Sequence, residues 1–325
     1  MSQAIGVDLG GSHVMAAVVS ANGMLGKRHE LDLTDLHPDV VVDALHTVIR
    51  AALADADGSV AGIGIGSPGN IDSESGTVRY SPNFGWENVP LGARLRTLFP
   101  KLPILVANDA RCATLGEYVY GVGAGTDNFV LLTLGTGIGG GIVAKGTLLL
   151  GHMGGAGEIG HHQIRPDTGF VCFCGKIGCF ESQASGMGLL RHAARLAESF
   201  PRSTLLDVPR EKLGSKAIRK AAQAGDPHAV AAFNAFCDDL ALGLANVIAF
   251  VNPEVIALGG GVSSAGEFLL EKVRPLVDAR TTMVPRGTTR IVRATLGNDA
   301  GAVGAATAAM RGGLIARVES TPSVA

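Results

Sequence analysis

Apolar and polar positions in the first part of the chain predict short strands and one amphipathic helix. Apolar runs at Ile5–Leu9 and Val14–Val19 flank a turn of small residues, which predicts two strands joined by a tight connection. From Pro38 to Leu53, apolar side chains recur at helical spacing, so we expect a helix there. Two further apolar runs predict buried strands at Val60–Ile65 and Ile104–Ala107.

The middle of the chain repeats the opening arrangement. Phe129–Leu134 and Gly139–Ala144 are apolar and flank Gly135-Thr136-Gly137, as the first two strands flank Gly10-Gly11-Ser12. This repeat is weak, but it indicates two related halves. We expect further helices at Ala229–Phe250 and Ala300–Met310, further strands at Val255–Leu258 and Ile291–Ala294, and a frayed tail after Gly313. Strands that alternate with helices predict an α/β protein.

Length and charge restrict the class of protein. At roughly 150 residues per domain, 325 residues predict about two domains. The 27 basic and 29 acidic side chains give a net charge of −2, which provides no field for attracting nucleic acid or an anionic membrane. No secretory signal is readable, and the longest apolar run, Leu240–Val251, is shorter than the ~20 residues that span a bilayer. We therefore expect a soluble, cytoplasmic protein without nucleic-acid or membrane partners.

Glycine accounts for 46 residues, roughly twice its average share. It clusters directly after apolar strands in three places, at Gly10-Gly11, Gly135–Gly137 and Gly259–Gly261. Because glycine lacks a Cβ, such turns let backbone N–H groups approach an anion, which favours phosphate or nucleotide binding over plain hairpin turns. Asp8, just before the first cluster, fits a Mg²⁺ site beside phosphate; the alternative is a residue that caps the turn.

Two common nucleotide-binding motifs, the Walker A loop and the dinucleotide-binding glycine motif, do not account for these glycines. The chain has no G-x-x-x-x-G-K-[ST] loop. Gly64–Gly69 and Gly135–Gly140 match G-x-G-x-x-G, but neither is expected to lead into a helix. A dinucleotide-binding dehydrogenase is therefore disfavoured.

Asn108 and Asp109 follow a buried strand, at the kind of position where α/β sheets bind ligands. There Asp109 can accept the proton of a substrate hydroxyl that attacks phosphorus, and Asn108 can hydrogen-bond neighbouring hydroxyls. The alternative, which the pair alone favours, is that they cap a helix running to Tyr120.

A cysteine and histidine cluster supplies the second candidate chemistry. Its members are His161 or His162, Cys172, Cys174 and Cys179. Three thiols and one imidazole form a complete tetrahedral zinc set with no open position, which indicates a structural ion; the alternative is three free thiols. Spacing does not decide between the two histidines. Glu158 and Glu181 flank the cluster, and either bind a polyhydroxylated ligand or are simply solvated.

In combination these residues resemble the ROK family of sugar kinases, within the actin/hexokinase superfamily, and most of all its bacterial ATP-dependent glucokinases. The resemblance covers about Ile5 to Arg311. The matching pieces are Asp8-Leu9-Gly10-Gly11-Ser12, Gly66-Ser67-Pro68-Gly69, Ser81-Pro82-Asn83, Asn108-Asp109-Ala110, Leu134 to Gly141, Glu158-Ile159-Gly160-His161, Cys172 to Glu181 and Gly259-Gly260-Gly261.

The resemblance implies a two-domain actin/hexokinase-like (ribonuclease H-like) α/β fold with a cleft between the domains for sugar and ATP. It implies a small domain of residues 1–117 plus 298–325, to which the last helix returns, and a large domain of residues 118–297 that carries the zinc site. The implied activity is that of an ATP:hexose 6-phosphotransferase, with glucose converted to glucose 6-phosphate.

The same resemblance implies roles for individual residues. Asp109 would be the catalytic base, and Asp8 would lie beside the Mg²⁺ of Mg-ATP. The zinc ligands would be His161, Cys172, Cys174 and Cys179, with the second nitrogen of His161 on the sugar. The sugar would also be held by Gly69, Asn83, Asn108, Asp109, Glu158 and Glu181. The phosphates would be held by Gly10, Gly11, Ser12, Gly135, Thr136 and Gly137, with the adenosine near Gly259, Gly260 and Gly261.

One departure and three alternatives accompany this interpretation. Ser12-His13 replaces the Thr-Lys that is frequent in the family; serine keeps the hydroxyl, so we expect an effect on donor affinity only. The alternatives are a ROK kinase for fructose, mannose, allose or N-acetylmannosamine, a kinase that uses polyphosphate, and a sugar-responsive repressor. The repressor is disfavoured because family repressors carry an N-terminal helix-turn-helix, whereas strand-like sequence begins here at Ile5. We expect a homodimer or homotetramer, as is common in the family.

Overall fold

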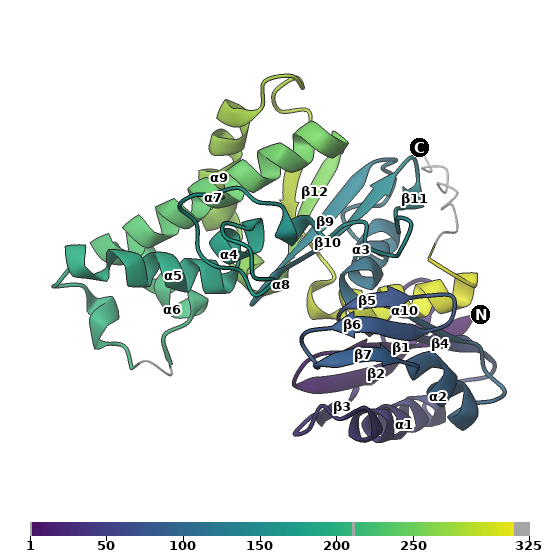
Figure 1. Cartoon of the computed structure of the whole chain (residues 1–325). Coiled ribbons are helices and arrows are strands. Elements are labelled where there is room, and N and C mark those ends of the chain that lie inside the picture. Colours follow the sequence, from purple (N-terminus) through teal and green to yellow (C-terminus); the bar gives the residue numbers. More distant parts are fainter. Residues whose placement is uncertain (1, 210–211, 315–325) are drawn as a thin grey trace. The chain divides into compact units, whose positions relative to one another are not determined.

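The structure is a computed structural model that describes residues 2–209 and 212–314, and it divides into two compact units (Figure 1). The first unit contains the residues up to Leu131, Gly141–Gly157 and the residues from Thr295 on; the second contains Leu132–Gly140 and Glu158–Ala294. The tail expected to fray begins at the end of the described part, and residues 315–325 lie outside it. The domain boundaries implied by the family resemblance stay a prediction.

The first unit is built on a five-stranded sheet. In spatial order its strands are β3 (His29–Asp32), β2 (His13–Ser20), β1 (Gln3–Leu9), β4 (Val60–Ser67) and β8 (Ile104–Asn108). β1 pairs antiparallel with β2 and parallel with β4, which pairs parallel with β8. The helices of this unit are α1 (Pro38–Ala54), α2 (Leu91–Leu98), α3 (Asp109–Tyr120) and α10 (Ala300–Arg311). The strands and helices predicted for this region are thus confirmed, with small shifts at their ends.

The two faces of β1 meet different helices, because side chains alternate along a strand. Its large apolar side chains pack into the main core with α1. Gly6 and Asp8 lie on the other face, against α10. A Cβ on Gly6 would lie 2.1 Å from the carbonyl oxygen of Ala302, so only glycine lets the helix pack this closely. This contact places Asp8 beside the first turn of α10.

A small antiparallel sheet lies in the chain between β4 and β8, where the apolar pattern gave no prediction. Its strands are β5 (Asn70–Asp72), β6 (Thr77–Ser81) and β7 (Trp86–Val89). Val78 and Trp86 extend the main core from this sheet, and the indole Nε1 of Trp86 donates a hydrogen bond to the carbonyl of Leu36 at 2.7 Å. Short strands with little alternation explain why it was missed.

The second five-stranded sheet has the strand order of the first. Its strands are β11 (Thr147–Leu148), β10 (Ile138–Ala144), β9 (Phe129–Leu134), β12 (Val255–Gly259) and β13 (Arg290–Arg293). In both sheets the third, second, first, fourth and fifth strands of the set follow one another in space. The internal repeat expected from the sequence is therefore confirmed at the level of topology.

Helices make up most of the second unit outside its strands. They are α4 (Phe180–Ala184), α5 (Gly186–Leu196), α6 (Ser215–Gln223), α7 (Pro227–Val251), α8 (Gly260–Ser263) and α9 (Glu267–Arg280). The long helix α7 lies at the centre, with α4, α5, α6 and α9 packed against it (Figure 1).

By length and composition α7 could cross a membrane, and it is the one such helix in the described part of the chain. The uninterrupted apolar run considered in the sequence is shorter, because Asp238 and Asp239 precede it. Of the most apolar stretch of α7, 56% is buried by the surrounding protein, as is typical of the core helix of a globular unit.

Candidate active-site residues in the two units

Two predicted carboxylates lie near each other in the first unit. Asp8 is near the end of β1, and Asp109 is the first residue of α3, directly after β8. β1, β4 and β8 run parallel, so their carboxyl ends share one edge of the sheet. Burial, followed by the charge of Asp109, raises the pKa of Asp8 to about 6; Asp299 adds to the rise and His13 opposes it. A buried carboxylate among like charges is a favourable place for a cation.

Asn108 caps α3, as one of the two interpretations of the sequence predicted. Its Oδ1 atom accepts the backbone N–H of Arg111 at 3.1 Å, and its Nδ2 atom donates to the carbonyl of Gly69 at 3.0 Å. Gly69 has φ +113°, and a Cβ there would lie 2.4 Å from the carbonyl oxygen of Tyr80. An amide has two donor hydrogens and two lone pairs, so these bonds leave it capacity for a ligand.

The glycine-rich segment Gly151–Gly157 is hydrogen-bonded to the rest of the first unit by side chains that the sequence analysis did not single out. The guanidinium of Arg111 is buried, and its Nε and Nη2 atoms donate to the carbonyl of Ala156 at 3.0 and 2.7 Å. Asn70 and Arg79 donate to the carbonyl of Met153 at 3.1 and 3.2 Å. The burial of Arg111 in α3 is the feature that points to this role, and burial of a single arginine is not visible in the sequence.

The remaining predicted residues of the first unit lie in turns. The N–H of Gly10 donates to the carbonyl of His13 at 2.9 Å and closes the turn that contains Gly11 and Ser12. Asn83 lies in an exposed turn between β6 and β7.

In the second unit, the loop Gly135-Thr136-Gly137 is closed by its own backbone and by a side chain. The N–H of Gly135 donates to the carbonyl of Gly137 at 3.0 Å, and the N–H of Ile138 donates to Oε2 of Glu181 at 2.9 Å. A Cβ on Gly137 would lie 2.3 Å from that same Oε2 atom. A predicted phosphate loop and a predicted sugar ligand are therefore in direct contact.

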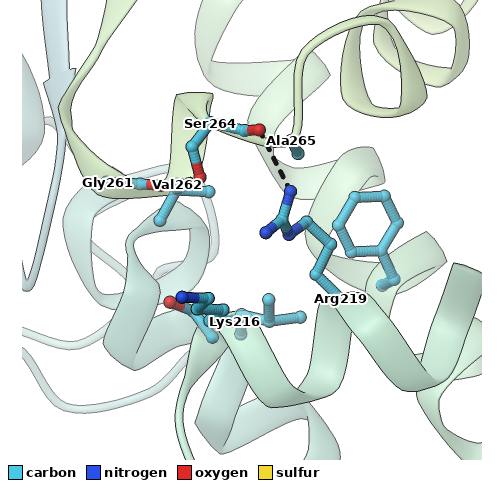
Figure 2. A pocket seen from close by; sticks show the side chains of 9 residues that line it. Lys216, Arg219, Gly261, Val262, Ser264 and Ala265 are labelled. Carbon is cyan, nitrogen blue, oxygen red and sulfur yellow. Dashed lines mark hydrogen bonds between the residues drawn. The ribbon is translucent and has the colours of Figure 1, made fainter. Parts of the chain in front are cut away.

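The third glycine cluster adjoins the second and borders a hollow. Gly260 has φ +78°, and a Cβ there would lie 2.6 Å from the carbonyl oxygen of Leu134, which precedes the loop Gly135-Thr136-Gly137. Beside Gly261 lies a shallow hollow (Figure 2). It is lined by Leu189, Ser215, Lys216, Arg219, Phe233, Gly261, Val262, Ser264 and Ala265. Arg219 forms one side, where it donates to the carbonyl of Ser264 at 3.0 Å (Figure 2).

The cysteine and histidine cluster forms as expected, and the structure selects the histidine. Ligand atoms of His161, Cys172, Cys174 and Cys179 all lie within 4.8 Å of one another. The ring of His162 lies elsewhere: its Nδ1 atom donates to the carbonyl of Ile159 at 2.6 Å. The two adjacent histidines thus have separate roles.

The spacing of the ligand atoms fits a tetrahedral zinc ion. With Zn–S bonds of about 2.3 Å, tetrahedral sulfur ligands lie about 3.8 Å apart. The Sγ atoms of Cys174 and Cys179 are 3.6 Å apart, and Nδ1 of His161 is 3.8 Å from Sγ of Cys172. Burial, followed by the neighbouring Cys174 and Cys172, raises the pKa of the Cys179 thiol to about 12, so this thiol would release a proton on binding zinc.

The second nitrogen of His161 is available to a different partner. Its Nε2 atom lies 4.0 Å from a carboxylate oxygen of Glu158, and both side chains are partly exposed. Glu181, two residues after Cys179, has Oε1 3.7 Å from Sγ of Cys172. Glu158 and Glu181 therefore lie beside the cluster in the second unit, as the sequence predicted.

Comparison with known proteins places the chain in a family. The ROK family profile matches residues 4–311. The chain is 39% identical over 306 residues to a glucokinase of Thermotoga maritima, covering 93% of this chain and 95% of that protein. It is 38% identical over 307 residues to a glucokinase of Halalkalibacterium halodurans, covering 92% of each chain. Among solved structures, a ROK family glucokinase from Streptomyces griseus in complex with glucose and AMPPNP superimposes with a TM-score of 0.82 at 36% identity, covering 94% of this chain and 98% of that one.

Proposed function

Since the chain belongs to the ROK family and has its two-domain actin/hexokinase-like fold, we propose that it is a glucokinase. It transfers the terminal phosphoryl group of ATP to the 6-hydroxyl of glucose and forms glucose 6-phosphate. The observation that carries this conclusion is 38 to 39% identity to two glucokinases over more than nine-tenths of the chain. The Streptomyces griseus relative holds glucose and an ATP analogue, which supports the same donor and acceptor here.

Asp109 is the catalytic base in this proposal. Its position at the start of α3, after the buried strand β8, leaves its carboxylate at the edge of the sheet near Asp8. It takes the proton of the sugar hydroxyl as the oxygen attacks the terminal phosphorus in line.

The donor-binding groups in this proposal are Asp8 and three glycine-rich turns. Asp8 would hold the Mg²⁺ ion of Mg-ATP, which would neutralise charge on the β- and γ-phosphates. The backbone amides of Gly10, Gly11 and Ser12, and of Gly135, Thr136 and Gly137, bind phosphate oxygens. Gly259, Gly260 and Gly261 lie beside the adenosine, and the hollow next to Gly261 adjoins this cluster (Figure 2).

The acceptor sugar is bound by hydroxyl-binding side chains and by the backbone at Gly69. The side chains are Asn83, Asn108, Asp109, Glu158, His161 and Glu181. The support is local: Asn108 is fixed by Gly69 and by the start of α3, and Glu181 is fixed by the amide of Ile138. Such fixed groups orient a sugar at little entropic cost on binding.

Zinc is structural in this proposal, with His161, Cys172, Cys174 and Cys179 as its ligands. The ion would supply a rigid centre, and with Nδ1 of His161 as the ligand atom, Nε2 would carry the proton and donate to a sugar oxygen. Four protein ligands leave no coordination position for substrate.

The remaining expectations are also part of the proposal. The protein acts in the cytoplasm as a homodimer or homotetramer. Its domains are residues 1–117 plus 298–325 and residues 118–297.

One assay tests the proposed reaction and its alternatives together. ADP release from Mg-ATP is coupled to a spectroscopic readout with glucose, mannose, fructose, allose and N-acetylmannosamine as acceptors. Turnover with glucose well above the other sugars is the expected result. Preference for another sugar would keep the reaction and change the substrate. No turnover with ATP, followed by turnover with polyphosphate, would overturn the assignment of the donor.

A further inference from the structure

The loop that carries the cysteines is closed at its neck by two backbone segments. We call Arg165–Gly178 the cysteine loop; Cys172 and Cys174 lie within it, and Cys179 follows it directly. The N–H of Arg165 donates to the carbonyl of Gly178 at 3.1 Å. A Cβ on Gly178 would lie 1.8 Å from the carbonyl oxygen of Arg165, so the two segments are in tight contact. The position of Arg165 therefore sets the position of the whole neck.

The side chain of Arg165 connects this neck to α7. Its Nε atom donates to Oδ1 of Asp239 at 2.8 Å, and its Nη2 atom donates to Oδ2 of Asp238 at 3.0 Å. The side chain of Asp239 is only 6% exposed, whereas those of Arg165 and Asp238 are 38 and 39% exposed. A guanidinium that bridges two carboxylates through separate N–H groups is fixed in direction as well as in distance.

The buried carboxylate also reaches the helix that carries Glu181. Oδ2 of Asp239 lies 3.3 Å from Nε2 of His192, and that nitrogen lies 3.1 Å from the carbonyl oxygen of Gln183 in α4. The ring of His192 also packs edge-on against Phe170 of the cysteine loop, with centroids 5.0 Å apart. Asp239 thus connects the neck of the cysteine loop to the short helix that follows Cys179.

We propose that Arg165 is a positioning residue for the acceptor site: by anchoring the cysteine loop to Asp238 and Asp239, it holds the metal ligands and Glu181 in their binding geometry. It touches neither the sugar nor the metal. The inference rests on the proposed function for the roles of Glu181 and zinc, but the anchor itself is a property of the contacts above. Nothing in the local pattern around Arg165 indicated this role, because its partners lie more than 70 residues away in the sequence.

The test compares Arg165→Ala with Arg280→Ala. Arg280 also pairs with Asp238, but it belongs to α9 and not to the cysteine loop, which makes it a matched control for loss of an ion pair on α7. Three quantities are measured on the full-length protein: zinc release to a chromogenic chelator, the KM values for glucose and for ATP, and hydrogen exchange of the amides in residues 165–179.

For Arg165→Ala we expect zinc release about tenfold faster, an effect typical of changes just outside a metal's ligands. We expect a glucose KM raised by about the same factor, a smaller rise in the ATP KM through the bond of Glu181 to Ile138, and faster exchange in the cysteine loop. Arg165→Lys keeps the charge but not the planar fork, so it should recover only part of each effect. Arg280→Ala should behave as wild type in all three.

The outcomes separate this inference from the proposed function. If the wild-type protein bound no zinc or phosphorylated no glucose, the proposed function would be wrong. Hydrogen exchange in residues 165–179 would still show whether Arg165 anchors the cysteine loop. If Arg165→Ala matched Arg280→Ala in loop exchange, zinc release and glucose KM, the positioning role would be wrong. Melting temperatures of the three variants identify any general loss of folding. If Arg165→Ala does not fold, the same three measurements on Arg165→Lys test the positioning role.

Discussion

The carboxylate of Glu181 accepts the backbone N–H of Ile138 at 2.9 Å. Ile138 directly follows the loop Gly135-Thr136-Gly137, which we assign to phosphate, whereas Glu181 is assigned to the sugar. In the proposed function, the same hydrogen bond therefore fixes one part of the donor site and one part of the acceptor site. A change at this contact is expected to affect both substrates together.

Gly137→Ala tests that coupling. The added Cβ would lie 2.3 Å from Oε2 of Glu181, so the carboxylate must move and its bond to Ile138 must weaken. Loss of a charge-assisted hydrogen bond predicts KM values for glucose and ATP that both rise about tenfold, with a lower melting temperature. A rise confined to one substrate would contradict the shared role.

Gly135→Ala is the matched control for stability in the same loop. No atom lies within 4 Å of a Cβ built on Gly135, so its melting temperature should stay at the wild-type value. Equal destabilisation by both substitutions would show that the loop backbone, and not Glu181, sets the effect.

Asp109→Asn tests the catalytic base. The asparagine Oδ1 can keep the bond that Oδ1 of Asp109 accepts from the N–H of Ala110 at 2.8 Å, so the start of α3 should be preserved. Loss of general-base catalysis predicts a kcat lower by about a hundred- to ten-thousand-fold. Glucose binding measured by calorimetry should be retained. A kcat near that of wild type would remove Asp109 from the mechanism.

Metal analysis tests the zinc assignment. Purified protein should contain about one equivalent of zinc per chain, as a closed four-ligand site requires. Cys174→Ser should lower the zinc content and raise the glucose KM, because His161 loses its fixed orientation. Cys237→Ala should keep the metal, since Cys237 lies in the core on α7. Full zinc content in Cys174→Ser would exclude that ligand.

Asp226→Ala tests the start of α7, which carries the partners of Arg165. Asp226 caps this helix by accepting the N–H of Ala229 at 3.0 Å, and it also accepts from Ser203 and Thr204. Although burial opposes ionisation, these hydrogen bonds lower its pKa to about 2. Because the folded pKa lies below the usual value of 3.8, the stabilisation is present above about pH 4 and is lost as the pH falls towards 2.

The expected loss for Asp226→Ala is about 1 to 2 kcal/mol of unfolding free energy at pH 7, and much less near pH 2.5. Urea denaturation at several pH values measures it, with Asp278→Ala at an exposed position of α9 as the control. A difference that does not change with pH would assign the effect to lost contacts alone.

Much of the fold follows from local pattern. The strands on either side of each glycine turn, the helix α1 and the helix α7 were predicted because apolar spacing is a local property. The sheet β5–β6–β7 was not, since its strands are short and its apolar residues few. The role of Glu117 also was not readable: this buried side chain accepts the N–H of Leu296 at 2.6 Å, 179 positions along the chain.

The candidate site shows the same limit at shorter range. The ligand types of the metal cluster were evident from composition, but His161 and His162 are chemically identical neighbours. Their roles are separated by the 3-10 turn Ile159–His161, which directs the first ring to Cys172 and leaves the second against Phe180. The family resemblance identified His161 as the ligand, whereas the spacing of the residues in the sequence did not distinguish it from His162.

Asp8→Asn tests the electrostatics of the first unit. Burial and Asp109 raise the pKa of Asp8 from 3.8 to about 6, so the folded protein holds this proton more tightly than the unfolded chain does. Ionised Asp8 is therefore a cost to stability, fully present above about pH 6 and gone below about pH 4. Removing the charge should raise the free energy of unfolding at pH 7 by on the order of 2 kcal/mol. The gain should shrink as the pH falls through this window, while activity with Mg-ATP is lost because the cation loses its carboxylate.

Denaturant titrations of Asp8→Asn and the wild-type protein from pH 4 to 7.5, without Mg²⁺, measure the difference, and Asp57→Asn at an exposed carboxyl is the control. Equal stability of Asp8→Asn and wild type across that range would show that burial does not raise the pKa of this group.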